Sequence, residues 1–205
     1  MKLKRLFWIC VMTVLVCGVC RADAPHGVGG FVLGHSIADY RDRVDMSTDL
    51  PIRHMEYLRE VEIRPIDGFK SGLIHYGTCH VPGTIVRIKL KYADSRKAFF
   101  DQLLKRFKDR FGAPSEWRGD PFHIVIAWKW SFTDPDGNRI SLVLQHNTKD
   151  VEEKLGNSVK MALTNIIEKE RACYLKKTGE SESDRTRRQR RRENDAVDWN
   201  LFIPR

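Results

Sequence analysis

Residues 84–147 constrain the fold more than any other part of the chain, because their apolar residues recur with clear local periods. The segment opens with an alternation of apolar residues (Val86, Ile88, Leu90, Tyr92) and basic residues (Arg87, Lys89, Lys91). A period of two is typical of a strand with one buried face. The first element of this segment is therefore predicted to be a strand whose other face is basic.

An amphipathic helix is predicted to follow this strand and to end at residue 111. Its apolar residues are spaced three and four apart, at Phe100, Leu103, Leu104, Phe107 and Phe111. This spacing places them on one face of an α-helix. Asp94 or Ser95 can cap its start, while Gly112 as a left-handed cap, followed by Pro114, predicts its end.

A long β-hairpin with one aromatic face is predicted for residues 122–144. The large apolar residues at alternate positions are Phe122, Ile124, Ile126, Trp128, Trp130 and Phe132, and the turn-rich residues 134–138 reverse the chain. A five-residue loop would place Phe132 opposite Ile140, Trp130 opposite Leu142 and Trp128 opposite Leu144. Burying each such side chain is worth about 1.5–3 kcal/mol, so we expect the helix to cover this face.

The remaining elements complete an α+β fold. We expect short strands at 31–33, 58–63 and 73–79, a short helix from Ser36 to Val44, and a loop over 45–57. After Asn147 a second helix is predicted from a stripe of Leu155, Val159, Leu163, Ile166 and Ile167. The predicted fold class is α+β, a mainly antiparallel sheet with two helices packed on one face, in a single domain of residues 23–177.

The stretch FVLGHSIADY, residues 31–40, resembles the strand–glycine–serine–helix opening of small exported bacterial domains, such as the small lipoproteins of outer-membrane assembly. The whole chain also resembles uncharacterised exported α+β proteins of sulfate-reducing bacteria. Neither resemblance supplies a functional residue for this chain.

The N-terminus has the three-part pattern of a secretory signal peptide. Three basic residues by position 5 are followed by an apolar run from Leu6 to Val19 and by a small-residue exit. We expect cleavage after Ala22, with Ala24 as a second option, and a periplasmic or secreted protein. Cys17 and Cys20 raise lipidation as an alternative, although Val16 and Val19 precede them where a lipobox has a small residue.

The two cysteines that remain after cleavage, Cys79 and Cys173, admit two interpretations. In an oxidising compartment they can form one disulfide. They can also be two buried, unpaired thiols.

Most of the formal charge of +9 lies at the chain termini. Residues 1–22 contribute +4 and residues 176–205 contribute +3, which leaves +2 for the body between them. We predict that residues 178–205 form a flexible Arg-rich tail with an apolar C-terminal peptide. Its arginines, Arg187, Arg188, Arg190, Arg191 and Arg192, can attract anionic lipid or another polyanion. No aromatic residues are interleaved with them, so no specific nucleic acid is predicted.

The sequence contains no coherent catalytic motif and none that indicates a cofactor. The candidates for acid–base chemistry in an exported hydrolase are His146 or His123 with a nearby aspartate, Asp120 or Asp150. The alternative interpretation of His146 is a polar strand end. Trp117 and Arg118, in the connection before the hairpin, are binding candidates.

The candidate metal ligands are His75, Cys79 and His80, with His123 or His146 as a fourth. On a strand, however, His80 points away from the other two, and no metal site is predicted. We favour a non-enzymatic binding or interaction module of the cell envelope, with an envelope protein or an anionic surface as its partner. Peripheral membrane contact through the tail and the exported hydrolase are the alternatives.

Overall fold

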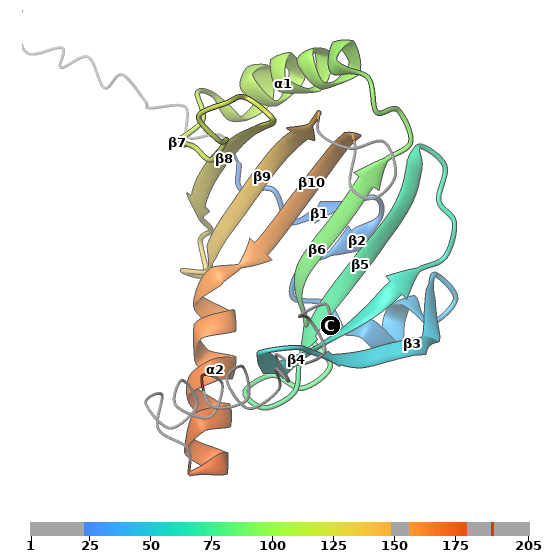
Figure 1. Cartoon of the computed structure of the whole chain (residues 1–205). Helices are drawn as coiled ribbons and strands as arrows, with labels where there is room; N and C mark the ends of the chain where they lie inside the picture. Colours follow the sequence, from blue (N-terminus) through green and yellow to red (C-terminus); the bar gives the residue numbers. More distant parts are fainter. Residues whose placement is uncertain (1–22, 149–155, 180–189, 191–205) are drawn as a thin grey trace, which may run out of the picture.

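The structure is a computed structural model that describes residues 23–148, 156–179 and 190 (Figure 1). Its main sheet has the strand order β3-β4-β5-β6-β10-β9-β8-β7, and every neighbouring pair is antiparallel. In chain order these strands are β3 Val44–Ile52, β4 Met55–Ile63, β5 Phe69–Gly77, β6 Ile85–Tyr92, β7 Glu116–Trp117, β8 Val125–Thr133, β9 Arg139–Asn147 and β10 Gly156–Leu163. The smaller elements are β1 Gly27–Val28, β2 Phe31–Val32, the 3-10 helix η1 Ile37–Tyr40, α1 Lys97–Phe111 and α2 Thr164–Thr178. The predicted α+β fold with a mainly antiparallel sheet and two helices is confirmed.

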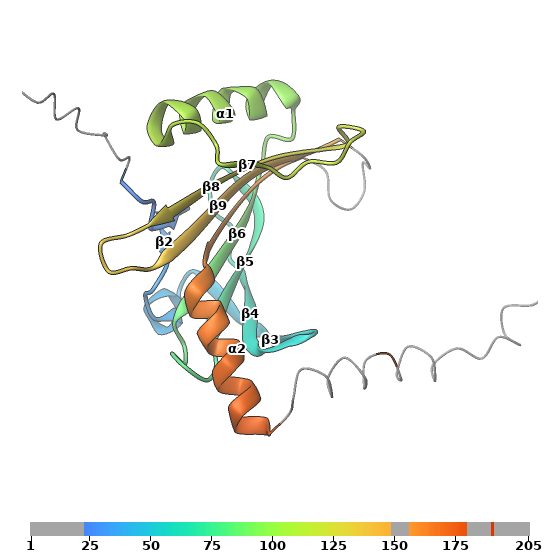
Figure 2. The ribbon, with the colours of Figure 1, turned by 90° about the vertical axis from the view of Figure 1, so that its left-hand side faces the viewer.

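Helix α1 covers the aromatic face of the β8–β9 hairpin, as its apolar stripe predicts. Phe100 is fully buried, and the rings of Phe107 and Trp130 lie 5.7 Å apart. Phe111 meets Phe132 at the same centroid distance of 5.7 Å. Figure 2 shows α1 lying over the β7–β10 part of the sheet. These aromatic side chains are therefore core residues.

The predicted hairpin register is confirmed. Trp128 pairs with Leu144, Trp130 with Leu142 and Phe132 with Ile140, as expected for the five-residue loop. Gly137 has a φ of 78°, which glycine adopts easily, and Asp134 accepts a hydrogen bond from the Asn138 backbone N–H at 2.7 Å.

The residues at the two ends of α1 differ from the prediction in their capping. The residue before the helix is Arg96, whose side chain makes no capping hydrogen bond. Asp94 accepts from the Arg96 backbone N–H at 2.9 Å, so it orders the turn before the helix. Gly112 does end the helix with a positive φ of 77°, but its ψ of −166° lies outside the left-handed helical region.

The prediction of a helix starting directly after Asn147 is wrong over residues 156–163. These residues form β10, which pairs with β6 on one side and β9 on the other. Only from Thr164 does the chain become helical, as α2. Val159 and Leu163 thus belong to a strand, whereas Ile166 belongs to the helix.

The prediction of a loop over 45–57 is also wrong. Most of these residues lie in β3 and β4, which pair along the edge of the sheet. Register shifts between Asp45 and Leu50 and between Pro51 and Ile52 interrupt the ladder. Because bulged edge strands lack a regular alternation of buried and exposed residues, they cannot be recognised as strands from the spacing of apolar residues.

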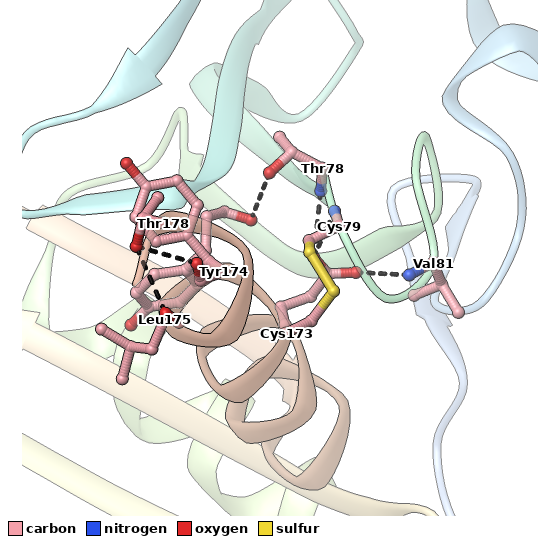
Figure 3. Close-up of a disulfide and its surroundings, with 9 residues drawn as sticks. Thr78, Cys79, Val81, Cys173, Tyr174, Leu175 and Thr178 are labelled. Atoms are coloured by element: carbon pink, nitrogen blue, oxygen red, sulfur yellow. Dashed lines mark hydrogen bonds between the residues drawn. A yellow bond between two sulfur atoms is a disulfide. The ribbon is translucent and has the colours of Figure 1, made fainter. Parts of the chain in front are cut away.

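Helix α2 is held to the loop after β5 by a disulfide and a buried carboxylate (Figure 3). The Cys79–Cys173 bond joins residues whose Cα atoms are 5.8 Å apart, so the disulfide alternative is the one adopted. Glu170, with 0% exposure, accepts hydrogen bonds from the backbone N–H groups of Thr78 (3.1 Å), Cys79 (2.7 Å) and Val81 (2.6 Å). Only glycine fits at position 77, because a Cβ atom there would lie 2.3 Å from the Glu170 carboxylate.

The two faces of the main sheet differ in character. Alternate residues of the central strands, such as Ile88, Leu142 and Met161, point into a core that also contains Phe31 of β2 and Phe100 of α1. The residues between them point to the opposite face, which we call the open face. In Figure 1 the strands β1 and β2 lie behind the sheet, and no described helix crosses the middle of the open face.

Candidate functional site

A row of side chains crosses the open face, each member opposite the next on a neighbouring strand. The strand registers place in this row, from β4 to β7, Glu62, Leu73, Lys89, Lys160, Val143, Lys129 and Glu116. Carboxylates occupy the two ends, and three lysines lie between them. The row therefore has a positive middle and negative ends.

A hollow of about 570 Å³ lies on the open face around the first half of this row. Five strands contribute to its walls. Its basic residues are Lys89, Lys91 and Lys160, its polar ones include Ser71, Gln145, Asn147 and Ser158, its apolar ones include Leu73 and Val143, and its one carboxylate is Glu62. This volume is within the range of small-molecule sites, about 300–1,000 Å³. Three ammonium groups against one carboxylate make the hollow net positive.

Lys89 and Lys160 are directly opposite each other on β6 and β10. Directly opposite residues have Cβ atoms about 4.5–5.5 Å apart, and like charges in that position destabilise a sheet. Partial desolvation within the hollow lowers the pKa of Lys160, and the nearby cations Arg87 and Lys89 lower it further. Two cations that face each other across neighbouring strands and line the hollow make this pair the first candidate for a ligand-binding role.

A second row beside the first contains Glu60, His75 and Arg87 on β4, β5 and β6. His75 is 3% exposed, and Arg87 lies with Nη1 3.3 Å from its Nδ1. Burial lowers the pKa of His75 to about 3, and the charge of Arg87 acts in the same direction. His75 is therefore neutral at neutral pH, and its Nε2, 3.4 Å from the Glu60 carboxylate, makes no hydrogen bond within the described residues.

The far end of the row is organised by Glu116. Its carboxylate lies 3.1 Å from Lys129 Nζ and 2.8 Å from Arg118 Nε. The hydrogen bond from Lys129, and then the charge of Arg118, hold the pKa of Glu116 below its usual value. Arg118 and Lys129 also act on Lys160, so the positive potential extends from the hollow towards β8. The binding candidate Arg118 therefore lies at the margin of the open face.

Trp117 points to the other side of the sheet. Its ring packs edge-on against Trp128 at 4.8 Å and lies 5.7 Å from the ring of His123. Asp120 accepts hydrogen bonds from the backbone N–H groups of Phe122 and Val125, and these bonds, Val125 first, lower its pKa. The structure thus separates Trp117 from Arg118 and gives Asp120 a turn-forming contact.

His146 is buried beneath α1 rather than placed at a surface. Its Nδ1 lies 2.7 Å from Asn157 Oδ1, and its ring is 5.5 Å from that of Phe100. Asn157 in turn donates to the carbonyl oxygens of Asp94 and Arg96. These contacts tie the ends of β9 and β10 to the start of α1, and they give no support to a hydrolytic dyad. Asp150 lies outside the described residues.

The three candidate metal ligands are not free to act together. The Cys79 sulfur is in the disulfide, His75 is buried beside Arg87, and His80 is exposed. Across residues 23–148 and 156–179, no group of three or more His, Cys, Asp or Glu side chains is arranged to hold a metal ion.

The terminal predictions fall largely beyond the described part of the chain. Residues 1–22 and the tail residues Arg187, Arg188, Arg191 and Arg192 lie outside it, and Arg190 is exposed. None of the helices in the described part is long and apolar enough to cross a membrane.

Only some of the residues at this site could be predicted from the sequence. Lys89 and Lys91 belong to the basic face of the strand predicted at 86–92. Lys160 was missed because its segment was interpreted as helix, so its position opposite Lys89 could not be foreseen. The alternation of Val159, Met161 and Leu163 with Lys160 was the available signal.

Comparison of the chain with protein-family models, curated proteins and solved structures finds no match.

Proposed function

We propose that this protein is an exported, non-enzymatic binding module of the cell envelope whose open face binds an anionic ligand. The observation that carries the proposal is the Lys89–Lys160 pair, two like charges directly opposite each other beside a hollow of about 570 Å³. A bound anion would relieve their repulsion. The polar side chains of Gln145 and Ser158 would complete the contacts.

Two further observations support export. The Cys79–Cys173 disulfide is of the kind that persists in oxidising compartments. The basic start and apolar run of residues 1–22 have the pattern of a signal peptide. A periplasmic or secreted location therefore fits a domain that meets anionic ligands of the envelope.

The test is calorimetric titration of the oxidised protein with small anions, namely citrate, inorganic pyrophosphate and galacturonate, at low and raised ionic strength. We expect at least one of them to bind in a salt-dependent manner. The double variant K89Q/K160Q should bind it at least about tenfold more weakly, because each charge-assisted hydrogen bond is worth about 1.5–3 kcal/mol.

The matched control is K105Q, which removes one lysine charge from α1, where Lys105 is 77% exposed and pairs with Asp109. K105Q should bind as the unmodified protein does. A second control replaces the five tail arginines at 187, 188 and 190–192 with glutamine. If binding is lost in the tail variant and kept in K89Q/K160Q, the tail is the binding element and the proposal is wrong.

A further inference from the structure

The basic surface of the open face extends beyond the hollow. Lys160 is followed in the row by Val143 and then by Lys129, two strands away on β8. With neighbouring strands about 4.8 Å apart, the line from Lys89 on β6 to Lys129 on β8 is roughly 14 Å long. A single small anion cannot contact both ends of that line.

The row also has defined limits. Glu62 stands before Leu73 at one end, and Glu116 stands after Lys129 at the other. These carboxylates would repel an anion that extended further. The arrangement thus favours a ligand with several negative charges that lies across the strands, over β6, β10, β9 and β8.

The surface beside the row of cations suits a hydroxyl-rich ligand. Ser158 and Gln145 are directly opposite each other on β10 and β9 and line the hollow. Hydroxyl and amide side chains can donate to and accept from sugar hydroxyl groups. None of the residues that line the hollow is aromatic, so there is no platform on which nucleic-acid bases could stack.

We infer that the ligand of the open face is an acidic polysaccharide, a linear chain of carboxylated or sulfated sugars that crosses the strands from Lys89 to Lys129. This inference rests on the proposed function and adds to it the class and the direction of the ligand. Arg118, whose Nε lies 2.8 Å from the Glu116 carboxylate, stands beside the Lys129 end of this line.

The experiment compares galacturonate with its tetramer and octamer on the unmodified protein and on K160Q, K129Q and E116Q. We expect the octamer to bind more tightly than the tetramer and far more tightly than the monomer. K160Q should weaken all of them. K129Q should weaken the octamer about threefold to tenfold, lower the slope of log affinity against log salt by about one, and leave the monomer unchanged.

E116Q gives the most discriminating test, because it should strengthen binding of the octamer, whereas the lysine variants should weaken it. Removing this carboxylate releases Lys129 and Arg118, whose exposed ion pairs with it contribute only modestly. We therefore expect up to about fivefold tighter binding of the octamer, with the monomer unaffected. Circular dichroism of each variant confirms that the sheet is intact, and K105Q again serves as the charge control.

The outcomes separate this inference from the proposed function. If the monomer binds as tightly as the octamer and only K160Q weakens it, the site is a small-anion site and the polysaccharide inference is overturned. If polyphosphate or single-stranded DNA of matched charge binds as well as the octamer with the same dependence on Lys129, the ligand class is wrong. If no anion binds in a Lys160-dependent manner, both proposals fail.

Discussion

Replacing the disulfide by the double variant C79A/C173A should lower the free energy of unfolding by about 2–5 kcal/mol. The two cysteines are 94 residues apart, and closing a loop of that length removes chain entropy worth about 4.7 kcal/mol from the unfolded state. The folded structure should persist, because Glu170 still accepts three backbone hydrogen bonds from the same loop.

The measurement is urea unfolding of the oxidised protein, of the reduced protein and of C79A/C173A, followed by circular dichroism. Reduction and substitution should give the same loss of stability. A loss below about 1 kcal/mol in both cases would refute the argument from loop closure, and a native-state spectrum that changes in C79A/C173A would refute the role given to Glu170.

The variant E170Q separates the two anchors of α2. An amide nitrogen would then face backbone N–H donors, and leaving such a buried group unsatisfied costs about 1–3 kcal/mol. We expect a loss in this range for E170Q in the oxidised protein. The loss of stability caused by E170Q should differ between the oxidised protein and C79A/C173A. The carboxylate and the disulfide hold the same loop, and neighbouring sites of this kind do not contribute independently.

Three further predictions concern the core and the open face. K160Q should raise the free energy of unfolding by about 0.2–1 kcal/mol, because it removes the repulsion with Lys89, although it weakens ligand binding. Urea unfolding measures this change, with K105Q as the control. A K160Q variant less stable than the unmodified protein would contradict the claim that the two lysines repel each other. Stability should fall as the pH is lowered from 6.5 towards 3, with a contribution from His75 of at most about 1.4 kcal/mol per pH unit. The sign follows because burial lowers the His75 pKa from 6.5 to about 3, so the unfolded chain binds more protons in this interval; H75Q should show a shallower pH dependence, and an unchanged one would contradict the argument. W130A should cost about 3–5 kcal/mol, since Trp130 is 2% exposed and its indole donates to the Gly112 carbonyl at 2.9 Å; a loss below about 1.5 kcal/mol in urea unfolding would show that this core is loosely packed.

The elements that sequence analysis predicted correctly are those whose periodicity is local and complete. The stripe from Phe100 to Phe111 and the alternation from Ile126 to Phe132 each match one secondary structure only. The short turn at 134–138 then fixes the hairpin register, because loop length decides which residues face each other. Burial of the aromatic face against α1 followed from the need to cover it.

The elements that were wrongly predicted depend on partners far away in the chain. Residues 156–163 contain apolar residues that fit a strand and, together with Ile166 and Ile167, also fit a helical stripe. The strand is adopted because β6 and β9 offer backbone partners on both sides. In β3 the bulges remove the alternation, so only its pairing with β4 identifies it as a strand.

The sequence by itself determined the basic face of β6, the amphipathic α1 and the presence of two cysteines able to pair. Only the tertiary structure decided that Lys160 lies opposite Lys89, that Arg118 and Lys129 extend the same positive surface, and that Cys79 meets Cys173. The physical reason is the range of the interactions. Side-chain periodicity acts over a few residues, whereas the pairing of strands that bring together residues 71 positions apart, such as Lys89 and Lys160, depends on how the whole sheet is assembled.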